Sequence, residues 1–172
     1  LSYFKLPEEG NPFLGFRAIR ICLERTDIFK TQLRAILRAS NYGNVKIMFP
    51  MIATVPELKA ARSLLKEVED ELRAEGIPYA EDLEIGMMME TPAAAVISDK
   101  FAKLVDFFSI GTNDLIQYTT AVDRMNSKVA NLYSPFNPSV LKLIKQIIEN
   151  GHQAGIWVGI CGEAASIPAL IP

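Results

Sequence analysis

The stretch Val105-Asp-Phe-Phe-Ser-Ile-Gly-Thr-Asn-Asp114 decides the fold class. Its first six residues are mostly apolar and predict a buried strand, and the polar residues Gly111 to Asp114 follow directly. Three other stretches have the same form, an apolar run that ends on small or polar residues: Val45–Phe49, Leu83–Met89 and Trp157–Ile160. The sequence therefore predicts four buried strands with polar residues at their carboxyl ends.

Segments with helical spacing of apolar residues separate these strands. We predict helices over 16–40, broken near Asp27, and over 54–75, 93–104 and 138–152, with a weakly periodic stretch at 115–137. Thr54 and Glu57 form a capping-box pattern at the start of the second helix. Such alternation indicates an α/β fold with a parallel sheet. The pattern alone does not choose between an open doubly wound sheet and a barrel.

The composition excludes several classes of protein. The 172 residues are 49% hydrophobic and 22% charged, as in a globular protein, and the net charge of −2 argues against a nucleic-acid partner. No apolar run is long enough to span a bilayer, and no secretory signal opens the sequence. Cys22 and Cys161 lie far apart without metal-ligand spacing, so we expect a reduced, cytoplasmic setting. The sequence lacks an initiator Met and stops at Pro172, so we expect an internal piece of a longer protein.

Glu90 is the first candidate site residue, because it directly follows the apolar run Ile85–Met89. A carboxylate at the end of a buried strand needs a partner, since an isolated buried charge is very costly. Glu90 either ligates a metal ion or forms a salt bridge with a nearby Arg or Lys.

Asn113 and Asp114 end the next strand, so Asp114 supplies a second carboxylate near the height of Glu90. Two carboxylates with few other acidic neighbours suit Mg²⁺, which fills its shell with waters and substrate oxygens. The Asn113 amide is able to donate to a phosphate oxygen. The alternative is that Asn113 or Asp114 only caps the following helix. Together with Glu90, the metal site is the favoured interpretation.

Cys161 ends the fourth strand between Gly159-Ile160 and Gly162. A buried cysteine is often only a small apolar residue, but a thiol of near-neutral pKa is able to give a proton to a carbanion. Arg17, Arg20 and Arg124 are the candidate clamps for phosphate and carboxylate, although Arg17 and Arg20 also fit a solvated helix face. His152, the only histidine, is expected at the surface.

These residues lie in long motifs with a recognisable order. The run Asp106-Phe-Phe-Ser-Ile-Gly-Thr-Asn-Asp-Leu-Ile-Gln-Tyr-Thr119 resembles the signature of phosphoenolpyruvate-utilising enzymes. Four further segments agree with it: Asn11–Arg20, Met48–Met51, Gly86–Pro92 and Gly159–Glu163. The sequence is most similar to the enzyme I family of the bacterial sugar phosphotransferase system, over nearly its whole length.

The resemblance implies a fold and a place within a larger protein. Residues 1–172 would be the central part of the carboxyl-terminal, phosphoenolpyruvate-binding (β/α)₈ TIM barrel, with about four of the eight strands. That domain is also the dimerisation domain in the family, so a homodimer is expected. The amino-terminal phospho-histidine domain, the first barrel strands with two further arginines, and the last barrel segment would all be absent. The segment Ala164–Pro168 departs from the family pattern.

The resemblance also implies roles for the candidate residues. Glu90 and Asp114 would ligate Mg²⁺, and Asp114 with Asn113, Arg17 and Arg124 would bind the substrate. Cys161 would protonate the enolate to give pyruvate. The parent protein would be a cytoplasmic bacterial transferase that passes the phosphoryl group of phosphoenolpyruvate to its own histidine and then to the carrier protein HPr.

Two alternatives remain open from the sequence. Pyruvate phosphate dikinase and phosphoenolpyruvate synthase share several of the motifs. A non-catalytic module, a stable partial barrel that binds partners through its open edges, is the second. Because half of the expected arginine clamp lies outside residues 1–172, we expect no phosphoryl transfer by this segment alone.

Overall fold

Four strands form one parallel sheet in the computed structural model, which describes residues 8–170. The strands are β1 (Ile47–Phe49), β2 (Ile85–Met89), β3 (Phe107–Gly111) and β4 (Trp157–Cys161). Their order in the sheet is β1-β2-β3-β4, the order of the sequence, and every neighbouring pair is parallel. A doubly wound sheet reverses its strand order at a switch point, whereas a barrel adds each strand beside the last. The sheet is therefore a segment of a barrel.

The helices fall between these strands largely as predicted. They are α1 (Ile19–Glu24), α2 (Thr26–Ser40), α3 (Val55–Ala74), α4 (Pro92–Val96), α5 (Ser98–Phe101), α6 (Thr112–Thr120) and α7 (Pro138–Gln153). The predicted break near Asp27 falls at Arg25, and the predicted capping box of Thr54 and Glu57 is confirmed at the start of α3. The helix predicted for 93–104 is two short helices, and part of the weakly periodic stretch is helix α6. The Pro- and Gly-rich residues 1–16 predict a loop, and residues 1–7 lie outside the described residues.

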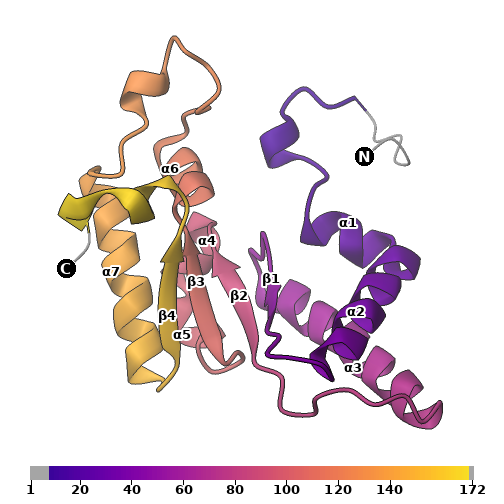
Figure 1. Ribbon diagram of the computed structural model, residues 1–172. Helices are drawn as coiled ribbons and strands as arrows, with labels where there is room; N and C mark the ends of the chain where they lie inside the picture. The colour runs from indigo at the N-terminus through magenta and orange to yellow at the C-terminus, as the bar shows by residue number, and fades with distance from the viewer. Residues whose placement is uncertain (1–7, 171–172) are drawn as a thin grey trace.

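The helices cover one face of the sheet. In Figure 1, α2 and α3 lie on the side of β1, and α7 lies beside β3 and β4 with α4 and α5 packed against it. The alternate strand residues that face these helices are almost fully buried, among them Met87, Met89, Phe108 and Ile110. The prediction of strands buried on both faces holds for β2 and β3. It is wrong for the edge strands β1 and β4, where Met48 is 37% and Trp157 43% exposed, because each has a neighbouring strand on one side only.

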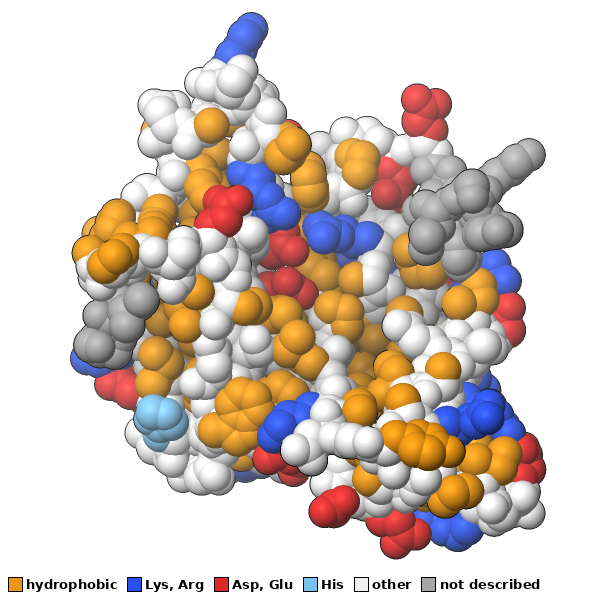
Figure 2. All heavy atoms as spheres, in the orientation of Figure 1, with side chains coloured by type: hydrophobic (Ala, Val, Ile, Leu, Met, Phe, Trp, Pro, Cys, Tyr) orange, Lys and Arg blue, Asp and Glu red, His pale blue; other side chains and the backbone are white. Residues whose placement is uncertain are grey.

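The carboxyl ends of the strands carry most of the irregular structure. The short 3₁₀ helix η1 (Pro12–Leu14), α6 and the segment 121–137, which includes η2 (Ala130–Leu132), gather at this end, at the top of Figure 1. Figure 2, in the same orientation, shows acidic and basic side chains together in a hollow in the upper part of the molecule. No helix among residues 8–170 is long and apolar enough to cross a membrane.

Candidate functional site

Glu90 lies one residue beyond β2 and is 7% exposed. Its Oε1 accepts a hydrogen bond of 2.6 Å from the backbone N–H of Met51, which follows β1. Met51 has a φ of 56°, a left-handed conformation that residues with side chains seldom adopt and that tends to persist where a site requires it. Burial raises the pKa of Glu90 to about 7, and the nearby Asp114 adds to this, while the Met51 N–H and Arg17 act in the opposite direction.

Asp114 lies in the first turn of α6 and is 8% exposed. Its two oxygens are shared between two arginines. Arg124 Nη1 lies 2.8 Å from Oδ1, and Arg17 Nη2 lies 3.5 Å from Oδ2. Because Asp114 also acts on the pKa of Glu90, the two carboxylates lie near each other, beside two guanidinium groups.

The two arginines are themselves held by neutral groups. Arg17 Nη1 donates to the hydroxyl of Tyr118 at 3.1 Å, and the backbone N–H of Arg124 donates to Gln117 Oε1 at 3.1 Å. The guanidinium carbons of both arginines lie 5.6 Å from the ring centroid of Phe13. An aromatic face at that distance attracts a cation. The arginine pair is thus positioned by α6 and by the segment that contains η1.

Asn113 joins α6 to the end of β4. Its side-chain oxygen accepts from the backbone N–H of Glu163 at 3.0 Å, and its carbonyl accepts from the hydroxyl of Tyr133 at 3.2 Å. Neither Asn113 nor Asp114 caps α6 with its side chain, because the N-cap position is Gly111 and no side-chain capping bond forms there. The capping alternative is therefore wrong.

Cys161 ends β4 and is half-buried. Its Sγ lies 3.5 Å from Ser109 Oγ and 3.6 Å from Met88 Sδ. Gly111 is the register partner of Cys161, and a Cβ added to Gly111 would meet Glu90 Cβ and Met88 Sδ at 2.9 Å. The missing side chain of Gly111 thus lets Glu90 and Met88 approach its backbone closely, and Gly111 lies on β3 between the strands that end on Glu90 and Cys161.

The donor set fits a hard divalent cation held by few protein ligands. Residues 8–170 contain no group of three or more His, Cys, Asp or Glu side chains able to hold a metal. The two carboxylates match the one or two that Mg²⁺ commonly takes from a protein. Burial is the main cause of the raised pKa of Glu90 and the charge of Asp114 adds to it, so a cation bound to both carboxylates would favour the ionised form of Glu90.

Two residues considered from the sequence lie outside this cluster. Arg20 Nη1 donates to the carbonyls of Leu14 at 2.8 Å and Gly15 at 2.9 Å, so it shapes the segment before α1. His152 is exposed near the end of α7, as predicted.

Three residues of the cluster were missed: Met51, Tyr118 and Phe13. Tyr118 had a usable signal, because residues four apart on a helix share a face and Tyr118 follows Asp114 by four. The contact of Met51 with Glu90 joins residues 39 positions apart and depends on a single left-handed residue, so no sequence pattern indicates it.

Comparison with known protein families gives one match over the whole chain. Residues 1–172 match the PEP-binding domain of PEP-utilising enzymes. The chain is 61% identical over 172 residues to the phosphoenolpyruvate-protein phosphotransferase of Geobacillus stearothermophilus and 60% identical to that of Bacillus subtilis. Each alignment covers all of this chain but only 30% of the relative's length.

Solved structures of similar fold come from other enzymes. A citrate lyase from Burkholderia xenovorans superposes with a TM-score of 0.58 at 21% identity, over 76% of this chain and 40% of that one. An HpcH/Hpal aldolase/citrate lyase family protein from Burkholderia cenocepacia gives 0.56 at 21% identity, over 80% and 57%. At this identity the likeness concerns the fold alone, and it agrees with the predicted partial barrel.

Proposed function

Because the chain belongs to the PEP-utilising enzymes and matches their PEP-binding domain, we propose that it forms part of the site where a phosphoenolpyruvate-protein phosphotransferase takes up its phosphoryl group. The observation that carries this proposal is the meeting of Glu90 and Asp114 beside Arg17 and Arg124 at the carboxyl ends of adjacent strands. The relatives compared above are named for this activity, which favours it over the dikinase and synthase alternatives.

In the proposed reaction, the bond between phosphorus and the enol oxygen of phosphoenolpyruvate breaks. A histidine of a separate phospho-histidine domain takes the phosphoryl group and loses its N–H proton to solvent, and HPr is the next acceptor. The enolate left behind takes a proton at its methylene carbon and becomes pyruvate. The residues of this chain have to bind the substrate, spread its charge and supply that proton.

Glu90 and Asp114 would hold Mg²⁺ in this proposal. Bound there, the ion supplies positive charge that stabilises the transferring phosphoryl group. Both carboxylates are nearly buried, so the surrounding protein screens their charges weakly. Because Glu90 must be ionised to act as a ligand, binding is favoured at a pH above its raised pKa of about 7.

Arg17 and Arg124 would bind the phosphate and carboxylate of the substrate, together with Asn113. Guanidinium groups suit these anions because they present two parallel N–H donors. Both arginines share the carboxylate of Asp114, so a bound anion competes with Asp114 for their N–H groups. The oxygen of the Asn113 amide already accepts from Glu163, so its NH₂ group is the part that would donate to the substrate.

Cys161 would act as the acid that protonates the enolate. Its sulfur makes only long contacts, at 3.5 to 3.6 Å, with Ser109 Oγ, Met88 Sδ and the Ile110 carbonyl. The thiolate then regains a proton from solvent. The flanking Gly162 has a φ of 89°, a left-handed conformation that turns the backbone, and its lack of a side chain leaves space beside the thiol.

The partners and setting of the whole protein belong to the same proposal. A homodimer is supported by large apolar side chains exposed in the segment after α6: Met125 is 75% exposed, Leu132 58% and Phe136 50%. A cytoplasmic bacterial location is supported by two free cysteines, Cys22 and Cys161, since a reducing compartment keeps thiols unpaired.

A chimera tests the proposal. This chain replaces the matching 172 residues of the Bacillus subtilis relative, and pyruvate release from phosphoenolpyruvate is measured with HPr and Mg²⁺. We expect Mg²⁺-dependent turnover. Cys161→Ala should stop pyruvate formation while sparing substrate binding, measured by calorimetry. A folded chimera that neither binds nor turns over phosphoenolpyruvate would refute the proposal and favour a non-catalytic module.

A further inference from the structure

Tyr118 ties two parts of the cluster together. It lies on α6, one turn after Asp114, and its hydroxyl accepts from Arg17 Nη1 at 3.1 Å while donating to the backbone carbonyl of Phe13. Burial raises the pKa of Tyr118, so its hydroxyl keeps the proton that it donates. One hydroxyl therefore fixes an arginine and, at the same time, the backbone of the segment that contains η1.

Phe13 faces both arginines. Its ring centroid is 5.6 Å from the guanidinium carbon of Arg17 and 5.6 Å from that of Arg124. Two like charges repel at short range, and the negative face of an aromatic ring partly offsets this repulsion. The position of the Phe13 ring thus bears on both members of the arginine pair.

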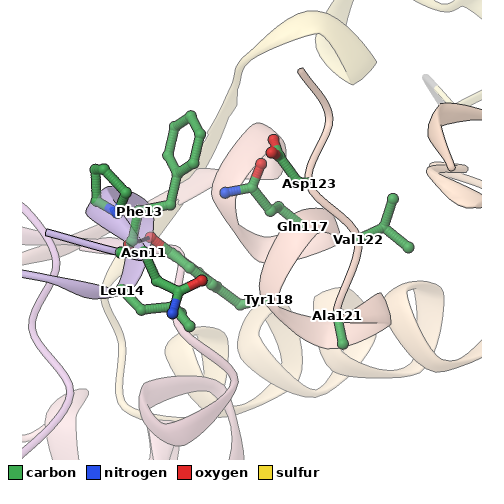
Figure 3. A pocket seen from close by; sticks show the side chains of 10 residues that line it. Asn11, Phe13, Leu14, Gln117, Tyr118, Ala121, Val122 and Asp123 are labelled. Atoms are coloured by element: carbon green, nitrogen blue, oxygen red, sulfur yellow. Dashed lines mark hydrogen bonds between the residues drawn. The ribbon is translucent and has the colours of Figure 1, made fainter. Parts of the chain in front are cut away.

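The segment around η1 meets α6 through Tyr118 and, just after the segment, through the Arg17–Asp114 ion pair. A cavity of about 330 Å³ separates the two, lined on one side by Asn11, Phe13 and Leu14 and on the other by Gln117, Val122 and Asp123. Figure 3 shows Tyr118 reaching from α6 toward the segment across this cavity. Where side chains do not fill the space between two elements, each of the few polar links across it contributes more to their placement.

The segment keeps its own shape by separate contacts. Arg20 donates to the carbonyls of Leu14 and Gly15, and the carboxylate of Glu9 accepts from the backbone N–H of Phe16 at 2.8 Å. The segment is therefore a preformed turn, and Tyr118 sets where that turn sits relative to α6.

We propose that Tyr118 is a positioning residue of the phosphate-binding arginines, which it acts on directly at Arg17 and through the Phe13 ring at Arg124. This inference rests on the proposed function, because it assigns the arginine pair to the substrate. The Tyr118 hydroxyl contacts Arg17 and the Phe13 carbonyl, and its hydrogen bonds do not include the carboxylates that would hold the cation. The predicted defect is therefore selective for the anionic substrate.

Tyr118→Phe in the chimera tests the inference, since it removes the hydroxyl and keeps the ring. We expect kcat/KM for phosphoenolpyruvate to fall about tenfold, the effect of losing one hydrogen bond to a charged group, mainly through a higher KM. The affinity for Mg²⁺, measured by calorimetry without substrate, should stay unchanged. A fall in Mg²⁺ affinity equal to the fall in kcat/KM would indicate a general structural role and overturn the inference.

Tyr79→Phe is the matched control. The Tyr79 hydroxyl accepts from Arg73 Nη2 at 2.8 Å, and the guanidinium carbon of Arg73 lies 6.0 Å from the centroid of the Tyr79 ring. Arg73 is on α3, away from the candidate site. This variant loses the same kind of bond and should keep its kinetics. If both variants kept the kcat/KM of the active parent chimera, Tyr118 would have no positioning role.

A second variant and a second measurement guard against misfolding. Phe13→Leu keeps an apolar side chain and removes the ring, and we expect the same selective rise in KM. In the 172-residue chain, the Nε–Hε resonance of Arg17 should move in Tyr118→Phe and stay in place in Tyr79→Phe. A folded parent chimera that neither binds nor turns over phosphoenolpyruvate would refute the proposed function, whereas an unmoved Arg17 resonance would refute the positioning role by itself.

Discussion

The two carboxylates of the site lie close together but are stabilised in opposite ways. Glu90, at the end of β2, has burial and one backbone N–H from Met51, and its pKa rises to about 7. Asp114, on α6, has two guanidinium groups, at 2.8 Å and 3.5 Å. The Glu90 side of the site therefore responds to protons, whereas the Asp114 side responds to a bound anion that draws the two guanidinium groups away from Asp114.

The difference follows from how each side is built. Asp114, Tyr118 and Arg124 come from α6 and the residues after it, within ten residues of one another. Glu90 depends on Met51, which is 39 residues away and reaches it from the neighbouring strand. The α6 side is a local unit, and the β2 side exists only when the sheet has formed. Variants on the two sides should therefore fail differently.

Asp114→Asn is expected to have the largest effect. It removes a proposed cation ligand and the shared partner of both arginines, so kcat/KM of the chimera should fall about 1,000-fold, or ~4 kcal/mol. Calorimetry with Mg²⁺ should show lost binding. Asp123→Asn, an exposed carboxylate in the segment after α6, is the control. Retained Mg²⁺ dependence in Asp114→Asn would break the division into two sides.

Glu90→Gln should change the pH dependence of stability. The native state holds the proton of Glu90 up to about pH 7, whereas an unfolded glutamate releases it near 4.5. The native state binds more protons between these values, so the free energy of unfolding falls as pH rises through that window, by about 3 kcal/mol in all. Glu90→Gln should remove this fall and be more stable than the parent above pH 7.

Urea denaturation of the 172-residue chain at several pH values measures that difference. Glu81→Gln, an exposed carboxylate, reports the effect of losing an acidic side chain in general. Parallel pH profiles for the parent and Glu90→Gln would show that Glu90 is not the group that burial affects.

Sequence reasoning reached the fold and most of the site because both depend on regular patterns. The apolar runs placed β2 and β3 correctly, and parallel strands bring their carboxyl ends to one edge, so Glu90 and Asp114 had to lie near each other. The choice of a barrel came from resemblance, since periodicity does not encode strand order. The strand order in the structure then supplied the physical reason for that choice.

The rest of the site escaped prediction because it depends on contacts that have no period. Arg20 looked like a clamp from its charge, yet backbone carbonyls of the preceding turn take its donors. The Phe13 ring reads as an ordinary apolar residue until its distance from two arginines is known. Met51 contributes an N–H that every residue has, and only its left-handed φ makes that group available to Glu90.

Gly111→Ala should displace Glu90 from the end of β3. A Cβ at this position meets Glu90 Cβ and Met88 Sδ at 2.9 Å, closer than normal packing permits, so we expect a loss of about 2 kcal/mol of stability. Gly43→Ala is the control, since a Cβ there meets nothing within 4 Å. Urea denaturation compares the two. Equal stability would mean that the strand ends shift easily, so that the spacing between Glu90 and Cys161 is not fixed by Gly111.

Arg17→Gln and Arg124→Gln are expected to have the smallest effect, a change in the pKa of Glu90, and they test whether the Glu90 and Asp114 sides are separate. Arg17 is among the groups that lower the pKa of Glu90, whereas Arg124 makes its ion pair with Oδ1 of Asp114. Arg17→Gln should therefore raise the pKa of Glu90 further, and Arg124→Gln should move it less. An NMR titration of the glutamate side-chain carbons in the 172-residue chain follows this shift. An equal rise in both variants would mean that both arginines act on Glu90 through Asp114, so that the two carboxylates form one coupled unit rather than two separate sides.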